Sequence, residues 1–285
     1  MEWHPAPAKL NLFLHILGRR DDGFHLLQTV FRLLDRIDKV GFELRDDGVI
    51  RRVDATPGVD EASDLCLRAA RRLREHAVAT RGPKFELLGA DIGLEKNLPI
   101  GGGLGGGSSD AATVLLVLNR LWGLECSRTE LMRLGLELGA DVPVFVFGES
   151  ALGEGVGERL TPLILPPAWY LVLMPQVSVS TKEIFSSTAL TRNTKPLKIP
   201  PFLPGSGTND LQEVAATLYP EVAAHLDWLS KYGDARMTGS GACVFAEFSS
   251  QAEASAVEAR LQHGMRGFVA RGLDRHPLRG WASGR

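Results

Sequence analysis

Residues 99–110 read PIGGGLGGGSSD, and this stretch governs how the rest of the chain is interpreted. Six of the seven positions from Gly101 to Gly107 are glycine, and only Leu104 interrupts them. Glycine loses more conformational entropy on ordering than any other residue and adds no side chain to the packing. The run therefore indicates a place where a ligand must approach bare backbone.

The residues after this loop predict a helix. Residues 111–122, AATVLLVLNRLW, contain good helix formers and neither proline nor glycine. Ser108, Ser109 and Asp110 directly precede them and are of the types preferred as N-caps. A glycine loop leading into a helix N-terminus offers free backbone N–H groups and the positive end of the helix dipole. The sequence therefore predicts a phosphate site here.

Other interpretations of the loop fit less well. A flexible Gly/Ser linker seldom lies between a Pro-Ile pair and an apolar helix. Gly101, Gly103 and Gly106 satisfy the dinucleotide pattern G-x-G-x-x-G, but residues 93–98 before them are charged and do not predict the buried parallel strand that this pattern needs. No Gly-Lys-Ser/Thr ends the run as in a Walker loop, and no His-Arg-Asp follows as in protein kinases. The loop indicates phosphate binding without naming the enzyme.

The composition is that of a globular protein with no electrostatic reason to bind polyanions. The 285 residues are 44% hydrophobic and 23% charged, with a net charge of −2, so we expect neither nucleic acid nor a membrane as partner. Three widely separated cysteines favour a reducing compartment, and without a signal peptide or long apolar run we expect a cytoplasmic protein. The seven histidines show neither H-E-x-x-H nor Cys/His pairing, so no structural metal is expected.

Two charged residues stand in apolar surroundings. Residues 7–17 alternate as a strand, which places Lys9 and Asn11 on the same face as Phe13. Both a solvated face and a partly covered face with an anionic partner for the lysine agree with this pattern. Asp141 is the only charge between two apolar segments, where a carboxylate is costly unless it is paired or hydrogen-bonded. An N-cap or turn is its simplest role, and residues 129–138 before it predict a helix ending at Gly139.

The remaining pattern mixes short strands and helices. Residues 148–167 are rich in Gly, Glu and Pro, which is typical of a domain junction, and the proline-rich residues 188–208 predict either a mobile flap or a surface excursion. We expect antiparallel hairpins over 26–53 and 236–246, strands at 85–88, 170–175 and 267–270, and helices at 64–80, 210–218, 221–231 and 251–262.

Three blocks together resemble a known family. PAKLNL at 7–12, the glycine loop, and TGSGA at 238–242 resemble, in this order, the three signatures of the GHMP kinases, the galactokinase–homoserine kinase–mevalonate kinase superfamily. DGFH at 22–25, GADVP at 139–143 and EGVGE at 154–158 are similar to the motifs of its members that act on 4-diphosphocytidyl-2-C-methyl-D-erythritol. The resemblance spans nearly the whole chain and is weakest in the proline-rich segment and beyond Ala270.

The resemblance implies a fold and a reaction. The fold would be α+β with two domains, residues 1–155 carrying the phosphate loop and residues 156–285 on the substrate side, with mostly antiparallel sheets flanked by helices and the active site in the cleft between them. The reaction would be ATP-dependent phosphorylation of the 2-hydroxyl of a cytidyl-diphosphate-linked methylerythritol in the non-mevalonate isoprenoid pathway, with Mg²⁺. The protein would be a monomer or a homodimer.

The resemblance also implies roles for single residues. Asp141 would be the general base, Lys9 would keep its carboxylate ionised and help to orient the hydroxyl, and Asn11 would contact the substrate near the reacting centre. The loop would wrap the ATP phosphates, and a serine hydroxyl could assist with Mg²⁺, although no metal ligand is firmly assigned. Asp110 would face away from the triphosphate or toward the metal. The implied ATP-binding residues are Leu65, Lys96, Asn97, Pro99, Gly101, Gly102, Gly103, Leu104, Gly105, Gly106, Gly107, Ser108 and Ser109.

The cytosine of the substrate would lie between Phe24 and Phe185, with His25 hydrogen-bonded to its edge and Thr181 also on the substrate side. Relatives commonly carry Tyr in place of Phe24, and Phe keeps a stack worth about 1–3 kcal/mol while losing the phenol hydroxyl. Many relatives have Asn in place of Asp64, which puts the adenine contact beside Leu65 in question.

Three alternatives stay open at this point. Homoserine and mevalonate kinases share the glycine loop but need no cytosine clamp. A catalytically idle nucleotide sensor would keep the loop, although Lys9 and Asp141 argue against it. A dehydrogenase would require a buried parallel strand before the loop.

Overall fold

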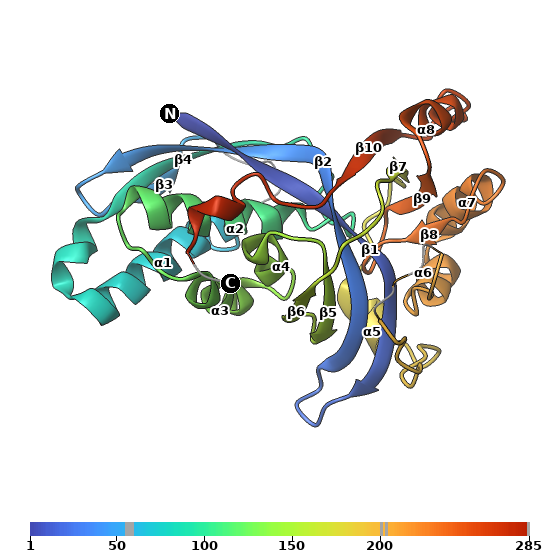
Figure 1. Ribbon diagram of the computed structural model, residues 1–285, viewed down its shortest axis with the longest axis horizontal. Helices are drawn as coiled ribbons and strands as arrows, with labels where there is room; N and C mark the ends of the chain where they lie inside the picture. Colours follow the sequence, from blue (N-terminus) through green and yellow to red (C-terminus); the bar gives the residue numbers. More distant parts are fainter. Residues whose placement is uncertain (55–59, 200–201, 203–204, 284–285) are drawn as a thin grey trace.

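In the computed structural model, which describes residues 1–54, 60–199, 202 and 205–283, a long antiparallel hairpin runs through the centre of the molecule. Strand β1 (Glu2–Arg19) pairs with β2 (His25–Arg45) along its length, and the expected Asp-Gly turn closes the hairpin, with Gly23 at a φ of 90°. Figure 1 shows both strands in blue, running from the helical half on the left down through the centre. The several hairpins expected over residues 26–53 are one strand of 21 residues followed by β3 (Ile50–Arg52), because no turn signal interrupts the β-rich sequence before Gly48.

Bulges break the strict alternation expected of β1. The register on β2 shifts between Pro7 and Lys9 and again between Asn11 and Leu14. As a result Phe13 is fully buried in the same cluster as Leu10 and Leu12, and not on the face predicted for it.

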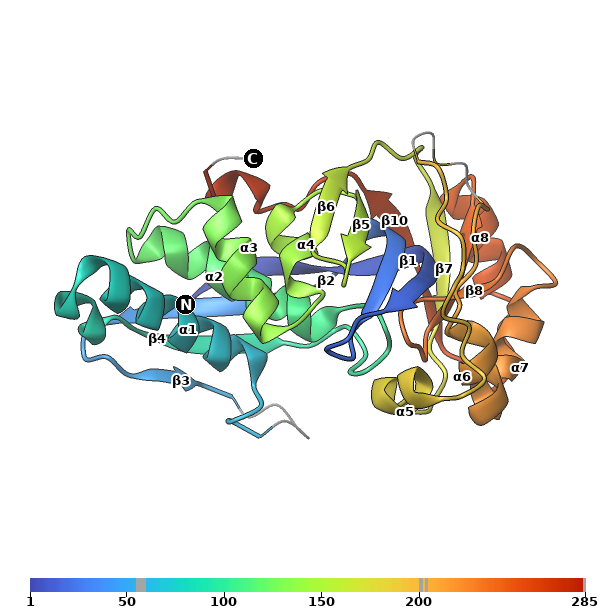
Figure 2. The same cartoon turned by 90° about the horizontal axis from the view of Figure 1, so that it is seen from below.

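The first half of the molecule is a sheet covered by four helices. Strand β4 (Gly89–Glu95) lies between β2 and β3, and the hairpin of β5 (Ala151–Gly155) and β6 (Arg159–Pro162) pairs with another part of β2. Figure 2 shows helices lying against this sheet, and buried apolar side chains between them form one large core. The helices are α1 (Leu65–Arg81), α2 (Gly106–Leu121), α3 (Arg128–Leu138) and α4 (Val142–Phe147).

One local prediction in this half is wrong. The strand expected at 85–88 is a 3-10 helix, η1 (Pro83–Leu87), because Gly82 turns the chain with a φ of 103° and Pro83 follows at the first helical position. The residues from Gly93 to Glu95 are the end of β4, and they do not form the buried parallel strand that a dinucleotide loop would need. Strand β4 is antiparallel to β2 and parallel only to the short edge strand β3.

The second half repeats the plan with a smaller sheet. Its strands follow the order β10 (Gly267–Leu273), β7 (Trp169–Leu173), β9 (Val244–Phe248) and β8 (Arg236–Met237). The helices of this half are α5 (Thr181–Ser186), α6 (Gln212–Leu218), α7 (Pro220–Leu229) and α8 (Gln251–Glu258). The strands and helices expected here are confirmed to within a few residues.

Strand β10 joins the two sheets. Its first part pairs with β7, whereas Gly272 and Leu273 pair with β2. Among the named strands of the described chain only β3 and β4 pair in parallel, so the expected α+β class with mostly antiparallel sheets is confirmed.

After β10 the chain returns to the first half. Leu278 and Ala282 enter the core that surrounds α2, with the 3-10 helix η2 (Arg279–Trp281) between them, and the Arg128 N–H at the start of α3 donates to the Ser283 carbonyl at 2.8 Å. The buried guanidinium of Arg128 donates to the carbonyls of Val146 and Ala282, at 2.8 and 2.9 Å, and so ties this end to α4. The domain division between residues 155 and 156 stays a prediction; it falls in the turn between β5 and β6.

The described part of residues 188–208 lies against the central hairpin. The Thr194 N–H donates to the carbonyl of Ile16 at 3.0 Å, and the amide of Gln28 exchanges two hydrogen bonds with the backbone of Leu197. The prolines at 200, 201 and 204 lie outside the described residues. Among the helices of the described chain, none combines the length and apolar character that a membrane crossing requires.

Candidate active site

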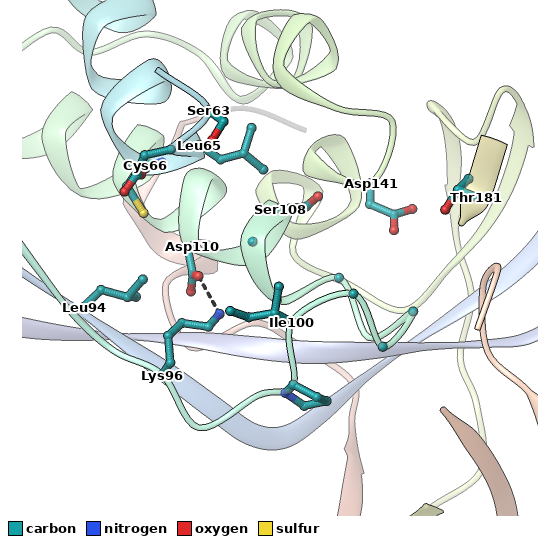
Figure 3. Close-up of a pocket in the computed structure, with 18 of the residues that line it drawn as sticks. Ser63, Leu65, Cys66, Leu94, Lys96, Ile100, Ser108, Asp110, Asp141 and Thr181 are labelled. Atoms are coloured by element: carbon teal, nitrogen blue, oxygen red, sulfur yellow. Dashed lines mark hydrogen bonds and ion pairs between the residues drawn. The ribbon is translucent and has the colours of Figure 1, made fainter. Parts of the chain in front are cut away.

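A pocket of about 400 Å³ opens at the N-terminus of α2 and is lined by both halves of the molecule. Figure 3 shows Leu65 and Cys66 at one end of it and Asp141 and Thr181 at the other, with Ser108 between. The expected site residues that line it are Leu65, Lys96, Pro99, Gly101, Gly102, Gly103, Gly105, Gly106, Gly107, Ser108, Asp141 and Thr181. The pocket thus brings most of the residues expected to bind the nucleotide, one of the two expected catalytic residues and one expected substrate residue into a single space between the halves.

Three of the expected nucleotide residues do not line the pocket. Leu104 is buried in the apolar cluster of Leu10, and its carbonyl accepts a hydrogen bond from the Lys9 N–H at 2.9 Å. It therefore anchors the glycine loop to β1. The second residue, Ser109, is fully buried. The third is Asn97, whose side-chain amide donates to the carbonyl of Ile37 at 3.2 Å.

The glycine loop runs directly into α2. Gly101, Gly103 and Gly105 have φ values of 73°, 76° and 71°, a conformation in which other residues are strained. The helix begins at Gly106, so the N-cap is Gly105 and the expectation that Ser108, Ser109 or Asp110 caps it is wrong. The left-handed Gly105 itself turns the chain into the helix, which leaves no position for a side-chain cap.

This start leaves backbone donors free. The first bond within the helix comes from the Ser109 N–H to the Gly105 carbonyl, at 2.8 Å. The N–H groups of Gly106, Gly107 and Ser108 precede that bond and have no acceptor within the helix. With the positive end of the helix dipole, they form a site suited to phosphate oxygens.

One side of the loop is packed on protein and the other side is open. A Cβ on Gly103 would lie 2.2 Å from the carbonyl oxygen of Thr238, and a Cβ on Gly102 would lie 2.7 Å from the Cys243 sulfur. A Cβ on Gly101 would meet nothing closer than 4.0 Å. The loop therefore rests on the TGSGA hairpin and turns bare backbone toward the pocket.

Lys9 is buried between the loop and Asp141. Its ammonium lies 3.2 Å from Asp141 Oδ2 and donates to Asn11 Oδ1 at 2.6 Å and to the Gly103 carbonyl at 2.9 Å. Only 1% of Lys9 is exposed, so the covered face with an anionic partner is confirmed and the solvated face is wrong. An ammonium has three protons, and here three acceptors surround it.

Asp141 keeps its carboxylate available. The residue occupies the N-cap position of α4, as its simplest role required, but its side chain makes no capping hydrogen bond. The side chain is 37% exposed and lines the pocket. A carboxylate that faces both a ligand space and a buried cation is suited to accept a proton from a bound hydroxyl.

Two threonines accept hydrogen bonds from Asn11, the residue that accepts from Lys9. The Asn11 amide nitrogen donates to Thr29 Oγ1, and its backbone N–H donates to Thr238 Oγ1, both at 2.9 Å. Thr238 lies in the TGSGA block, which was a signal, whereas the contact of Thr29 depends on the register of β2 on β1, which the sequence did not reveal.

Below the helix start, Lys96 forms a buried ion cluster. Its ammonium is hydrogen-bonded to Asp38 Oδ2 and lies 2.9 Å from Asp110 Oδ2, the contact drawn in Figure 3. Asp38 also accepts the N–H groups of Asn97 and Leu98, at 2.6 and 2.8 Å. Burial raises the pKa of Asp110 to about 7 against the attraction of Lys96. Burial opposes the charge of Lys96, but the two carboxylates outweigh it and raise the lysine pKa.

Asp64 has two structural roles beside the pocket. Its carboxylate accepts the N–H groups of Cys66 and Leu67, at 2.8 and 3.2 Å, and so caps α1. Its other oxygen pairs with Arg52 at 2.8 Å. These contacts place the cap directly before Leu65, which lines the pocket.

A second cluster lies outside this pocket. The rings of His25 and Phe185 are 4.9 Å apart, and Arg192 Nε donates to His25 Nε2 at 3.2 Å. Phe24 is 64% exposed in the adjoining turn. Burial, then the positive charges of Arg192 and Arg19, lower the pKa of His25. Arg192 carried no sequence signal, because it lies in the proline-rich segment.

Thr181 lies within the pocket, on the second half. It is the first residue of α5, and its hydroxyl lies 2.7 Å from the hydroxyl of Ser240 in the TGSGA hairpin.

The oxygen atoms around the start of α2 fit a magnesium ion held together with phosphates. Mg²⁺ usually takes one or two carboxylates plus substrate oxygens and waters. The Ser108 hydroxyl and the Asp141 carboxylate line the pocket, and Asp110 Oδ1 is buried with no hydrogen-bond partner among the described residues. No group of three or more His, Cys, Asp or Glu side chains that could hold a metal occurs in the described chain, so phosphate oxygens would complete the ligands.

Comparison with known proteins gives one family. The GHMP kinases N terminal domain matches residues 64–149, and the GHMP kinases C terminal domain matches residues 202–267. The chain is 60% identical over 274 residues to the 4-diphosphocytidyl-2-C-methyl-D-erythritol kinase of Thiobacillus denitrificans, covering 96% of each. It is 59% identical over 281 residues to the enzyme of that name from Nitrosospira multiformis, covering 98% of this chain and 93% of the relative.

A solved structure shows the same relationship. The crystal structure of a 4-(cytidine 5'-diphospho)-2C-methyl-D-erythritol kinase superposes with a TM-score of 0.78 at 33% identity, covering 95% of this chain and 99% of that one. The expected family resemblance and the expected fold are confirmed.

Proposed function

Because the chain belongs to the 4-diphosphocytidyl-2-C-methyl-D-erythritol kinases of the GHMP superfamily, and is thus a small-molecule kinase, we propose that it transfers the γ-phosphoryl group of ATP to the 2-hydroxyl of 4-diphosphocytidyl-2-C-methyl-D-erythritol. This step belongs to the non-mevalonate route to isoprenoid precursors. The observation that carries the proposal is the Lys9–Asp141 pair, 3.2 Å apart at the end of the glycine-loop pocket.

Asp141 acts as the general base. As the substrate oxygen bonds to the γ-phosphorus, the hydroxyl proton passes to the Asp141 carboxylate and the bond to the bridging oxygen of ADP breaks. Two observations support this role. The Asp141 side chain is partly exposed, and it makes no capping hydrogen bond to α4. Phosphoryl transfer otherwise depends on positioning and on stabilising the charge of the phosphate oxygens.

Lys9 positions the base and the loop. Since acceptors on Asp141, Asn11 and Gly103 surround its ammonium, the cation pairs with the carboxylate and holds the loop carbonyl in place. Asn11 accepts one of the Lys9 hydrogen bonds, and its contact with the substrate near the reacting centre stays a prediction.

The nucleotide occupies the other end of the pocket. The phosphates lie at the N–H groups of Gly106, Gly107 and Ser108, and the adenine lies toward Leu65 and Lys96. Ser108 and a nearby carboxylate would hold Mg²⁺ together with the phosphate oxygens, and the ion would supply positive charge against the transferred group. The cytidyl end of the substrate lies toward Thr181, His25 and Phe185, with Phe24 as the second aromatic wall. The cytoplasmic location and the monomeric or dimeric state stay predictions.

A coupled ADP-release assay with ATP and Mg²⁺ tests the proposed substrate. We expect turnover with 4-diphosphocytidyl-2-C-methyl-D-erythritol and none with homoserine or mevalonate. Turnover of one of the other alcohols would reject the cytosine clamp, and ATP binding without turnover of any alcohol would favour a nucleotide sensor.

A further inference from the structure

Arg192 connects the two residues that form the second cluster. Its half-buried guanidinium donates to the carbonyls of Phe185 and Ser187, at 3.0 and 2.7 Å, and to that of Leu190 at 3.0 Å. Its Nε donates to Nε2 of His25 at 3.2 Å. One side chain from the loop after α5 thus holds the end of that helix and the start of β2 together.

The chemistry of this contact fixes the state of the His25 ring. A guanidinium carries five donors and no acceptor, so the ring nitrogen that it contacts must present a lone pair. Nε2 of His25 is therefore without a proton, and a neutral ring must carry its hydrogen on Nδ1. A doubly protonated ring would set an N–H group against an N–H group, with the charges of Arg192 and Arg19 both opposed to it.

We propose that Arg192 is a positioning residue that holds His25 as the neutral Nδ1–H tautomer against the Phe185 ring, so that His25 offers the substrate nucleobase a hydrogen-bond donor. This rests on the proposed function, in which a cytidyl group binds at this cluster. Free histidine favours the Nε2–H tautomer, so the Nδ1–H tautomer of His25 depends on Arg192.

A donor at this place selects among nucleobases. Cytosine presents acceptors at N3 and O2, whereas uracil carries a proton on N3. Where it faces the N3 position, a neutral Nδ1–H pairs with cytosine and opposes the N3–H group of uracil. Because a site built around a hydrogen bond rejects a ligand that leaves its polar groups unpaired, Arg192 determines specificity through His25.

Arg192 also fixes the ring on which the base would stack. The last carbonyls of a helix have no partner within it, and Arg192 satisfies two carbonyls at the end of α5. Phe185 and His25, with rings 4.9 Å apart and inclined by 39°, are thereby held as one wall. Without Arg192, the His25 ring would no longer be held as the Nδ1–H tautomer, and the two rings would no longer be fixed in position.

The tautomer is measured directly in the ligand-free, full-length protein. Side-chain ¹⁵N NMR of histidine, with His25 assigned by its absence in His25→Gln, distinguishes protonated from unprotonated ring nitrogens. We expect Nδ1 protonated and Nε2 unprotonated at pH 7.5 in the wild type. Arg192→Met, which keeps bulk without a donor, should move the ring toward the Nε2–H form, and Arg192→Lys should restore part of the wild-type pattern.

The matched control is Arg68→Gln, which changes an exposed arginine on α1 and should leave the His25 signals unchanged. The proposal is overturned if wild-type His25 is doubly protonated or in the Nε2–H form, or if Arg192→Met leaves its nitrogen shifts unaltered. A merely structural role of Arg192 would lower the melting temperature without changing the tautomer.

Calorimetric titration with cytidine 5′-diphosphate and uridine 5′-diphosphate tests the consequence. The wild type and the Arg68→Gln control should prefer the cytidine ligand, and Arg192→Met should reduce that preference by about tenfold, the loss of one hydrogen bond. An unchanged preference would overturn the role in specificity. Failure of the wild type to bind either the cytidine ligand or the proposed substrate would instead overturn the proposed function, and the nitrogen shifts would still decide what Arg192 does.

Discussion

At the scale of single residues, the site depends on charges that the chain buries only with partners. Lys9 is enclosed by Asp141, Asn11 and the Gly103 carbonyl, and Lys96 by Asp38 and Asp110. Alternation along β1 left the environment of Lys9 open, because the bulges that bury it and the loop that covers it are set by distant segments. The motif resemblance alone predicted that Lys9 and Asp141 act as a pair.

Lys9→Met should remove the cation that pairs with Asp141, the proposed base, while keeping most of the side-chain volume. The Asp141 carboxylate and the Gly103 carbonyl lose a charged donor, so we expect turnover to fall by about 10²–10⁴-fold. ATP affinity should change far less, since the N–H groups of α2 stay in place. ADP-release assays and nucleotide titration measure the two effects. Lys39→Met, at an exposed ion pair with Glu95, is the control and should be near wild type.

At the scale of elements, the loop and α2 follow from local sequence, but the boundary between them does not. The glycine run and the apolar helix were predictable from composition and spacing. The helix starts earlier than the serines indicated, because Gly105 in a left-handed conformation takes the N-cap position. The strand expected at residues 85–88 failed for a comparable reason, since the Gly82–Pro83 pair outweighs the β propensity of Phe85.

Gly103→Ala should be far more damaging than Gly123→Ala. Both glycines have positive φ, 76° and 63°, but a Cβ on Gly103 would lie 2.2 Å from the Thr238 carbonyl oxygen, whereas one on Gly123 would meet nothing within 4 Å. We expect Gly123→Ala to cost about 1 kcal/mol of unfolding free energy and Gly103→Ala about 3 kcal/mol or more, with weaker ATP binding. Equal losses in urea unfolding would show that the loop does not rest on the hairpin.

Asp64→Asn should cost less stability than Asp64→Ala, although both leave the largely buried side chain of Arg52 without its anionic partner. Asn keeps the oxygen that accepts the N–H groups of Cys66 and Leu67 and loses only the charge facing Arg52. Removing the cap altogether costs about 1 kcal/mol. Urea unfolding of the two variants checks this, and similar losses in both would assign the main role of Asp64 to its ion pair instead of its cap.

At the scale of the whole molecule, long-range pairings connect the halves and place the pocket between them. Strand β10 pairs with β7 and then with β2, and the residues after it pack around Arg128 in the first half. The separate elements were predictable, but nothing in the local pattern of residues 267–270 indicated which two sheets the strand would join. Fold class and the cleft site came from the motif resemblance, and Arg192 could be found only once both halves were in place.

The buried cluster beneath α2 should make stability depend on pH. The folded state raises the pKa of Asp110 from 3.8 to about 7, so it binds this proton more tightly than the unfolded chain does. The contribution of this group therefore favours folding at low pH and is lost as the pH rises from about 4 to about 7. Asp110→Asn does not titrate, so its unfolding free energy relative to the wild type should rise between pH 5 and pH 8, by about 1 kcal/mol or more.

Urea unfolding at both pH values measures this difference. Asp227→Asn, at an exposed position on α7, is the control and should show none. A difference for Asp110→Asn that stays constant with pH would show that its carboxyl is ionised throughout the range.

The most direct test of the central claim is the single-turnover rate of Asp141→Asn with ATP, Mg²⁺ and 4-diphosphocytidyl-2-C-methyl-D-erythritol. The amide keeps an oxygen for Lys9 but cannot accept the hydroxyl proton. We predict a rate about 10²–10⁴-fold below that of the wild type, with unchanged ATP affinity. A rate within a few fold of the wild type would contradict the assignment of Asp141 as the base.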